Sequence, residues 1–154
     1  MRNLNKLENL NLSGTPVYDI SALRYSSNII LLDLSKTAIS DLSILPNLHK
    51  LEYLDLSYTN ISNLDEITRL SNLNYLNLTA VNLDDNLSGF ENLTSLNKIV
   101  LASTNINKLN FLSDVTSLNT INIDSTMVSD LSSLSGLENL SVLQANNTLV
   151  FNLK

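Results

Sequence analysis

The chain has 154 residues and no cysteine, which excludes disulfide bonds and metal sites built on thiolates. This absence suits a protein of a reducing compartment or of a bacterial surface. Tryptophan is also missing, and there are only three glycines and two prolines. By contrast, the chain holds 34 leucines and 24 asparagines. A bias this strong predicts a periodic architecture in place of an ordinary globular fold.

Basic residues are scarce. Nine lysines and arginines stand against 15 aspartates and glutamates, which gives a formal net charge of -6 at pH 7. A protein that binds nucleic acid needs clustered basic side chains to neutralise phosphates, and the sequence has no such cluster. We therefore expect no nucleic-acid partner. The same charge disfavours an acidic membrane surface.

Long apolar runs are absent as well. No stretch approaches the roughly 20 apolar residues of a membrane span, so we expect no membrane insertion. The opening residues 1–7 lack the uninterrupted apolar run of a secretory signal. This predicts a cytoplasmic protein if Met1 is the native start. If the sequence is an excised domain, the alternative is a bacterial cell surface.

Residues that carry catalysis are few. His49 is the one histidine, and there is no glycine-rich phosphate loop and no paired histidine motif for a metal. Serine and aspartate are abundant, but abundance alone does not assemble a catalytic triad. We expect no catalytic residues, no metal ligands and no cofactor, and therefore a protein that is not an enzyme.

What the chain has in abundance is a repeat. A strand-like pair of apolar residues, separated by one residue, recurs at Leu10/Leu12, Leu32/Leu34, Leu54/Leu56, Leu76/Leu78, Ile99/Leu101, Ile121/Ile123 and Leu143/Ala145. Successive pairs are 22 residues apart, except for one step of 23. In such a segment both apolar side chains point to one face and the middle residue points to the other. Stacked coils would place these strands side by side as a parallel sheet, with the leucines filling the interior.

The segment that returns from each strand has its own signature. Asp19-Ile20-Ser21, Asp41-Leu42-Ser43 and Asp130-Leu131-Ser132 occupy equivalent places, and Asn63-Leu64-Asp65 is a close variant. Side-chain oxygens at these positions can accept hydrogen bonds from the next free backbone N–H groups. We expect short one-turn helices of the tight 3-10 kind there.

A threonine follows most of the apolar pairs at a fixed distance of three residues, at Thr15, Thr37, Thr59, Thr104, Thr126 and Thr148. We expect each hydroxyl to donate to a backbone carbonyl of the neighbouring coil. The threonine column is then part of the scaffold, because it satisfies turn groups that would otherwise be unpaired.

These residues resemble the leucine-rich-repeat family, and residues 51–62 (LEYLDLSYTNIS) and 19–23 (DISAL) are similar to its bacterial internalin-like class. The resemblance implies an α/β solenoid: a right-handed superhelix with a concave parallel β-sheet and short helical or 3-10 turns on the convex side. It implies one domain over residues 1–154 with about seven coils, which can belong to a longer protein. It also implies that the concave face binds proteins. Threonine in place of the family's usual asparagine, and the lack of a recognisable amino-terminal cap, are departures.

The outward strand positions of coils two to five form the candidate partner-binding surface. Its residues are Leu31, Asp33, Tyr53, Asp55, Tyr75, Asn77, Lys98 and Val100. Tyr53 and Tyr75 are one coil apart, so we expect their rings to lie about 5 Å apart. Tyrosine is favoured at interfaces because it offers a large, stiff, amphipathic contact. The alternative is a tyrosine ladder that only stabilises the sheet.

The fourth coil is irregular. It alone has 23 residues, and it carries Val81 where the threonine is expected, with Asp84 and Asp85 close behind. We expect a local bulge over residues 79–90, which can serve recognition or reflect neutral drift. Asp84 and Asp85 form a secondary candidate site. Two adjacent acids favour a solvated turn over a cation site.

The leading prediction is thus a non-enzymatic module that binds a partner protein on its concave face and modulates or inhibits it. One alternative is the recognition domain of a bacterial surface adhesin. Another, from a different class, is the targeting domain of an enzyme. Both ends of the array lack a polar cap, and the carboxyl end is apolar at residues 149–151. Uncapped coils expose core leucines, so a homodimer through one end is a further candidate.

Overall fold

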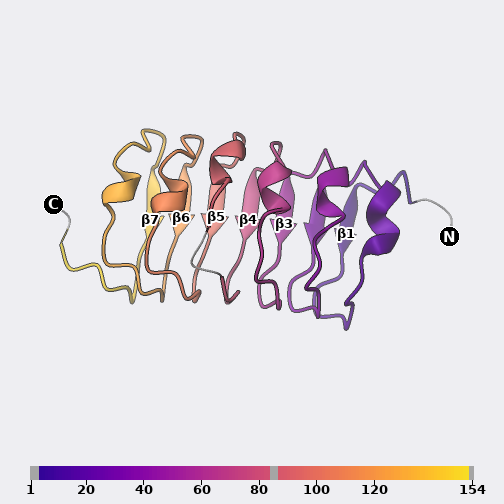
Figure 1. Cartoon of the computed structure of the whole chain (residues 1–154), viewed down its shortest axis with the longest axis horizontal. Coiled ribbons are helices and arrows are strands. Elements are labelled where there is room, and N and C mark those ends of the chain that lie inside the picture. The colour runs from indigo at the N-terminus through magenta and orange to yellow at the C-terminus, as the bar shows by residue number, and fades with distance from the viewer. Residues whose placement is uncertain (1–3, 84–86, 153–154) are drawn as a thin grey trace.

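A computed structural model of the chain describes residues 4–83 and 87–152. A single parallel sheet of seven strands runs in chain order through β1 (Asn9–Asn11), β2 (Leu31–Asp33), β3 (Tyr53–Asp55), β4 (Tyr75–Asn77), β5 (Lys98–Val100), β6 (Thr120–Asn122) and β7 (Val142–Gln144). Between the strands lie the 3-10 helices η1 (Ser21–Tyr25), η2 (Leu45–Asn47), η3 (Ile67–Arg69), η4 (Phe90–Asn92), η5 (Asn110–Leu112) and η6 (Ser132–Leu134). Figure 1 shows the coils stacked along the long axis, with the two termini at opposite ends.

The register of the sheet follows from the repeat. Each strand pairs with the next at equivalent repeat positions, so Leu32, Leu54 and Leu76 stand in one row across β2, β3 and β4. The backbone ladder extends beyond the strands, because the Leu34 N–H donates to the Asp55 carbonyl at 2.9 Å. Equivalent side chains of successive coils therefore become spatial neighbours.

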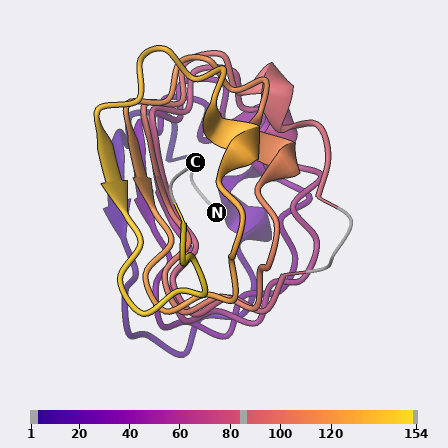
Figure 2. The ribbon, with the colours of Figure 1, turned by 90° about the vertical axis from the view of Figure 1, so that its left-hand side faces the viewer.

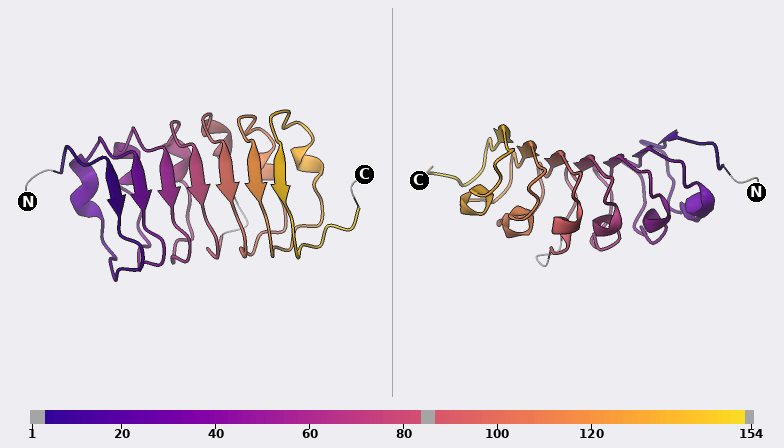
Figure 3. Two further views of the ribbon diagram at one scale, coloured as in Figure 1. Left: turned by 180° about the vertical axis from the view of Figure 1, so that it is seen from behind. Right: turned by 90° about the horizontal axis from the view of Figure 1, so that it is seen from above.

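The layers are those of a solenoid. Figure 2 looks along the stack and shows the sheet on one side of each coil and the 3-10 helices on the other. The view from above in Figure 3 shows a gentle curve with the sheet along its inner side. The predicted α/β solenoid, with a concave parallel sheet and short 3-10 turns on the convex side, is confirmed.

The core lies between these two layers and consists of the repeated apolar columns. Leu32, Leu54, Leu76, Ile99 and Ile121 are fully buried, and each is worth roughly 1.5–3 kcal/mol relative to an exposed side chain. Leu143 holds the same repeat position in β7 but is 37% exposed, because β7 has a described coil on one side only. The burial of each column therefore depends on having a coil on both sides.

A left-handed residue turns the chain after every strand. Lys36, Tyr58, Ala80, Ser103, Ser125 and Asn147 have φ angles between 55° and 59°, and Gly14 occupies the same place in the first coil at 70°. Positive φ is disfavoured for residues with a Cβ atom, and the lysine, tyrosine, alanine and two serines among these six carry no local preference for it. The turn is held by the ladder, since the Lys36 N–H donates to the Ser57 carbonyl at 2.8 Å.

The threonine column is structural, but its bonds differ from the prediction. The Thr37 hydroxyl donates to the Leu34 carbonyl of its own coil at 2.6 Å, and Thr104 does the same to Leu101 at 2.7 Å. The expected donation to the neighbouring coil is therefore wrong. The left-handed residue just before each threonine folds the chain back, which brings the hydroxyl onto the carbonyl three residues earlier.

The return segments behave as predicted. The Asp19 carboxylate accepts the Ser21 N–H at 2.7 Å, Asp41 accepts Ser43 at 2.8 Å, and Asn63 replaces the acid in the third coil, where it accepts the Asp65 N–H at 2.7 Å. The Ser21 N–H and hydroxyl hold the pKa of Asp19 below its usual value, and Ser43 does the same for the pKa of Asp41.

The long fourth coil returns through a second kind of left-handed turn. Gly89, just before η4, has a φ of 82°. A Cβ atom at this position would lie 3.2 Å from the Thr68 side chain of the preceding coil. Glycine at this position satisfies both the backbone angle and the close approach to the preceding coil.

Replacing Gly89 with alanine is expected to lower the free energy of unfolding by about 1–2 kcal/mol, because the new Cβ meets a positive φ as well as Thr68. Urea denaturation followed by circular dichroism measures the change. Gly136→Ala is the matched control, since a Cβ there has nothing within 4 Å. Equal losses in the two variants would show that the turn at Gly89 imposes no special requirement.

Candidate functional site

The parallel register brings the eight predicted site residues onto one patch. They come from four consecutive strands, β2 to β5, and alternate residues of a strand share a face. Two rows result: Leu31, Tyr53, Tyr75 and Lys98 in the first, and Asp33, Asp55, Asn77 and Val100 in the second. We call these the tyrosine row and the acidic row. The left panel of Figure 3 views this face of the sheet.

The tyrosine row is a tightly packed stack. The rings of Tyr53 and Tyr75 lie 4.4 Å apart with an angle of 2° between their planes. The predicted spacing of the rings is confirmed. The Lys98 Nζ lies 5.6 Å from the centroid of the Tyr75 ring, within the range of a cation–π contact. Leu31 stands opposite Tyr53 on the other side. Neighbours in the row thus occupy both ends of the stack, which leaves ring edges and hydroxyls for an external contact.

The acidic row is held by hydrogen bonds. Asp33 Oδ1 accepts the Ser35 N–H at 3.0 Å and the Ser35 hydroxyl at 2.7 Å, and Asp55 bonds Ser57 in the same way at 2.9 and 2.6 Å. Each remaining oxygen accepts an asparagine amide: Asn11 donates to Asp33 at 3.0 Å, and Asn77 donates to Asp55 at 2.8 Å. The two carboxylates of the acidic row are therefore held in place in the free chain.

The two tyrosines stay protonated over the physiological range. Burial raises the pKa of Tyr75 to about 12, and the neighbouring Tyr53 and Asp55 add to this shift. Burial also raises the pKa of Tyr53, with Asp55 contributing. Both hydroxyls can therefore donate hydrogen bonds to a bound molecule.

An alkaline titration is expected to show a late tyrosine step near pH 12 that disappears in Tyr75→Phe. Because the folded pKa of Tyr75 lies above the usual tyrosine value of 10.0, its stabilising effect is complete below pH 10 and is lost as the pH rises toward about 12. Near-ultraviolet absorbance of tyrosinate measures the step. Tyr25→Phe is the control and should keep it. A wild-type chain without the late step would contradict the packing described for Tyr75.

The irregular fourth coil gives a second, smaller feature. Asp84 and Asp85, the secondary candidates, lie outside the described residues. Beside them the Asn105 side chain bridges the backbone of coil four: its Oδ1 accepts the Leu83 N–H at 2.7 Å, and its Nδ2 donates to the Leu83 carbonyl at 2.8 Å. The described part of the predicted bulge thus has a side chain where other coils use backbone groups.

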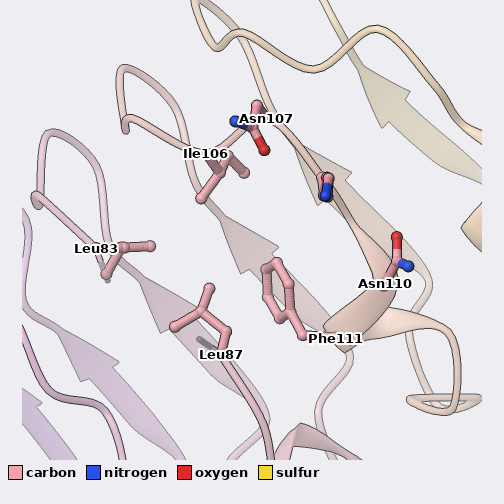
Figure 4. Close-up of a pocket in the computed structure, with 7 residues that line it drawn as sticks. Leu83, Leu87, Ile106, Asn107, Asn110 and Phe111 are labelled. Atoms are coloured by element: carbon pink, nitrogen blue, oxygen red, sulfur yellow. The ribbon is translucent and has the colours of Figure 1, made fainter. Parts of the chain in front are cut away.

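A pocket of about 240 Å³ opens next to this bridge, between the return segments of coils four and five. Figure 4 shows Leu87 and Phe111 facing one another, with Leu83 and Ile106 completing the apolar wall. Phe111 also meets the buried Phe90 edge to face, with ring centroids 5.0 Å apart. Sequence reasoning missed the pocket, because the position of an insertion does not reveal which side chains surround it.

Over residues 4–83 and 87–152, no group of three or more histidine, aspartate or glutamate side chains is placed to hold a metal ion. None of the helices in these ranges is long and apolar enough to cross a membrane.

The sequence predicted the eight residues of the patch, Lys98 among them, but not the contacts that hold them in place. The serines that hold the carboxylates, Ser35 and Ser57, lie two residues after the acids in the same repeat column. The Lys98 contact with Tyr75 follows from the same one-coil step that predicts the tyrosine stack. A comparison of equivalent positions in successive coils would have predicted both the Asp–Ser bonds and the Lys98–Tyr75 contact.

Comparisons with known proteins agree with this fold. An internalin (InlF) from Listeria monocytogenes aligns over 97% of this chain and 44% of its own, with a TM-score of 0.90 and 29% identity. Internalin C2 from the same organism aligns over 97% of this chain and 66% of its own, with a TM-score of 0.91 and 28% identity. A leucine-rich-repeat protein from Leptospira interrogans, at 21% identity, a TM-score of 0.86 and coverage of 96% and 39%, supports the fold alone.

No family model matches the sequence, and no curated protein matches it either. The chain spans 39% to 66% of the length of the solved structures named above. The repeat, the parallel sheet and these neighbours together define a leucine-rich-repeat protein. Within that class, the chain is internalin-like, as the 22-residue period predicts.

Proposed function

We propose that this chain is a non-enzymatic module that binds a partner protein on the concave face of its sheet and modulates or inhibits that partner. The internalin-like fold supports a protein-interaction module in general. The observation that carries the finer proposal is the Tyr53–Tyr75 stack, with its rings 4.4 Å apart. A rigid aromatic pair loses little conformational entropy when a partner covers it, so its contact area is converted efficiently into affinity.

The alternative role of the stack, as a ladder that only stabilises the sheet, predicts something different. Leucine and isoleucine columns already pack the opposite face of β2 to β5, where Leu32, Leu54, Leu76 and Ile99 are fully buried. The tyrosine row packs on the outer face of the sheet and is not part of the apolar core. A partner-binding role therefore predicts a loss of binding that exceeds the loss of stability when the rings are removed.

A capture experiment tests the proposal. The immobilised wild-type chain and Tyr53→Ala/Tyr75→Ala are compared for the proteins they retain from cells of the source bacterium and from its surroundings. Tyr18→Ala/Tyr25→Ala is the matched control, because these tyrosines are 75% and 66% exposed and Tyr25 lies in η1 on the convex side. A protein retained by the wild type and the control but not by the concave variant supports the proposal. Equal retention by all three contradicts it.

Two cellular locations are candidates for this protein. Likeness to proteins called internalins favours the bacterial cell surface, as the recognition part of an adhesin. A cytoplasmic protein that docks on a larger protein is the other. Fractionation of the source cells with an antibody against residues 4–83 separates the two.

A protein is the proposed partner, and not a nucleic acid, because the formal net charge is -6.

Self-association through the carboxyl end is a separate proposal. There Val142, Leu143, Leu149 and Phe151 are all exposed, Phe151 by 90%. Edge pairing of β7 between two copies would cover them. Light scattering that shows only monomers at micromolar concentrations would contradict it.

A further inference from the structure

The acidic row contains two adjacent aspartates, Asp33 and Asp55, whose charges the fold does not explain. We call this pair the junction. Along this column a side-chain amide donates to the equivalent residue of a neighbouring coil: Asn11 donates forward to Asp33, Asn77 donates back to Asp55, and Asn122 donates forward to Gln144 at 2.9 Å. The first two donations converge from opposite sides on Asp33 and Asp55. These two carboxylates are neighbours in register across β2 and β3, and ionised carboxylates have no proton to share. All four carboxylate oxygens accept hydrogen bonds within the chain, but no group of the described residues donates to both acids or offsets their two negative charges.

The turns do not require carboxylates at these positions. Asn11 accepts the Ser13 N–H at 2.8 Å, Asn77 accepts the Thr79 N–H at 3.0 Å, and Asn122 accepts the Asp124 N–H at 2.8 Å. These are the bonds that Asp33 and Asp55 make with Ser35 and Ser57. Asparagine therefore performs the structural task elsewhere in the same column, and the turn does not account for the two negative charges.

The charges also carry a cost. Like charges directly opposite on neighbouring strands are destabilising, and Asp55 is only 8% exposed. Within residues 4–83 and 87–152, the ion pair is Arg69 with Glu66, at 3.4 Å in and beside η3, and no lysine or arginine of these ranges pairs with Asp33 or Asp55. A cation from outside the chain would offset these negative charges.

The surroundings indicate which cation fits. Leu31 and Tyr53 precede the two acids by two residues on the same face of the sheet, so an apolar row runs beside the carboxylates. A basic side chain can lay its methylene stem along such a row and place its charged head on the acids. Its several N–H groups can bridge two carboxylates at once, and arginine does this with the best geometry.

The far end of the patch carries the opposite charge. Lys98 lies in β5, three strand spacings from Asp33, which is about 14 Å at the usual separation of strands. A bound segment with a basic residue over Asp33 and Asp55 would therefore run toward a positive charge. This polarity gives the site one preferred orientation for its ligand.

We propose that Asp33 and Asp55 form the docking point for a basic side chain of the partner, which lies beside the tyrosine row. The inference rests on the proposed function, because it places the partner on the same concave face. It adds the chemistry of recognition: a segment with a basic residue next to apolar ones.

A random peptide library displayed on phage supplies the probe. It is selected on the wild-type chain after depletion on Tyr53→Ala/Tyr75→Ala, so that only tyrosine-dependent binders remain. The selected peptides are expected to share an arginine or lysine flanked by apolar residues. Their dissociation constants, measured by fluorescence anisotropy, should rise about ten-fold or more in Asp33→Asn/Asp55→Asn. Asp124→Asn is the matched control: it removes one charge from the same face in the sixth coil and should leave the constants unchanged.

The outcomes separate the two proposals. Tyrosine-dependent peptides without a basic residue, or with constants unaffected by Asp33→Asn/Asp55→Asn, overturn the docking point and leave the proposed function standing. No tyrosine-dependent peptide at all contradicts the proposed function itself. The melting temperature of the double variant should equal or exceed that of the wild type, and a clear fall would assign the carboxylates a structural role. Calcium that binds the wild type alone, in place of basic peptides, would also overturn the inference.

Discussion

Removing both rings in Tyr53→Ala/Tyr75→Ala is expected to weaken binding of the partner about 100-fold or more, which corresponds to about 2.8 kcal/mol. Stiff aromatic side chains at the centre of an interface commonly contribute about 2 kcal/mol or more each when truncated. The stack is half-buried in the free chain, so a partner needs to cover only its edges to gain this contact. Isothermal titration with the captured partner measures the change.

The accompanying loss of stability should be smaller. An aromatic pair contributes about 0.5–1.5 kcal/mol beyond its buried area, and the leucine columns behind it are untouched. Thermal melts of the double variant check that it remains folded. Tyr53→Phe/Tyr75→Phe keeps the rings and should retain most of the affinity. A double alanine variant that binds as tightly as the wild type would leave the stack as a sheet stabiliser only.

The largest loss of stability is expected for Phe90→Ala, at about 3–5 kcal/mol. Phe90 is fully buried and is the largest side chain of the core, and it meets the Phe111 ring at 5.0 Å. Its removal leaves a cavity that neighbouring coils cannot fill, because each is fixed by the ladder of backbone hydrogen bonds. Guanidinium denaturation of the wild type and the variant gives the difference.

Phe111→Ala serves as the comparison for Phe90. Its ring is only partly buried and lines the pocket between coils four and five, so the expected loss is clearly smaller. Similar losses for both variants would mean that the apolar core does not extend through the return segment of the fourth coil as described.

The fold could be predicted from the sequence because one repeat of 22 residues makes one coil. Side chains separated by that distance must then be neighbours, which is why the Tyr53–Tyr75 stack and the leucine rows were predictable. The Asp–Ser signature of the return segments gave the 3-10 turns for the same reason. Each of these features depends on spacing alone.

The direction of the threonine bonds was not predictable. It depends on the left-handed residue before each threonine, and that column contains Lys36, Tyr58 and Ala80 among others. None of these three residue types favours positive φ. Gly14 and Asn147, at the two ends of the column, do favour it, but the residues between them give no sign of the turn. The stacked ladder imposes it, and the hydroxyl then faces its own coil.

The candidate site was likewise predictable only in part. Its eight residues followed from strand alternation, but the junction at Asp33 and Asp55 did not, because it depends on which amide donates to which oxygen. The pocket near Phe111 depends on which side chains of coils four and five line the space between them, and the repeat spacing does not reveal this. The repeat spacing therefore predicts which residues are neighbours in the sheet, but not which atoms bond or which side chains line a pocket.

Protection of single cysteines tests the binding face most directly, because the chain has no cysteine of its own. Leu31→Cys places a thiol in the tyrosine row, and Tyr25→Cys places one on the convex side in η1. The rate of reaction with a maleimide is measured with and without saturating partner. If the concave face binds the partner, the thiol at position 31 should react about ten-fold more slowly in the complex, while the thiol at position 25 keeps its rate. Protection at position 25 with no change at position 31 would contradict it.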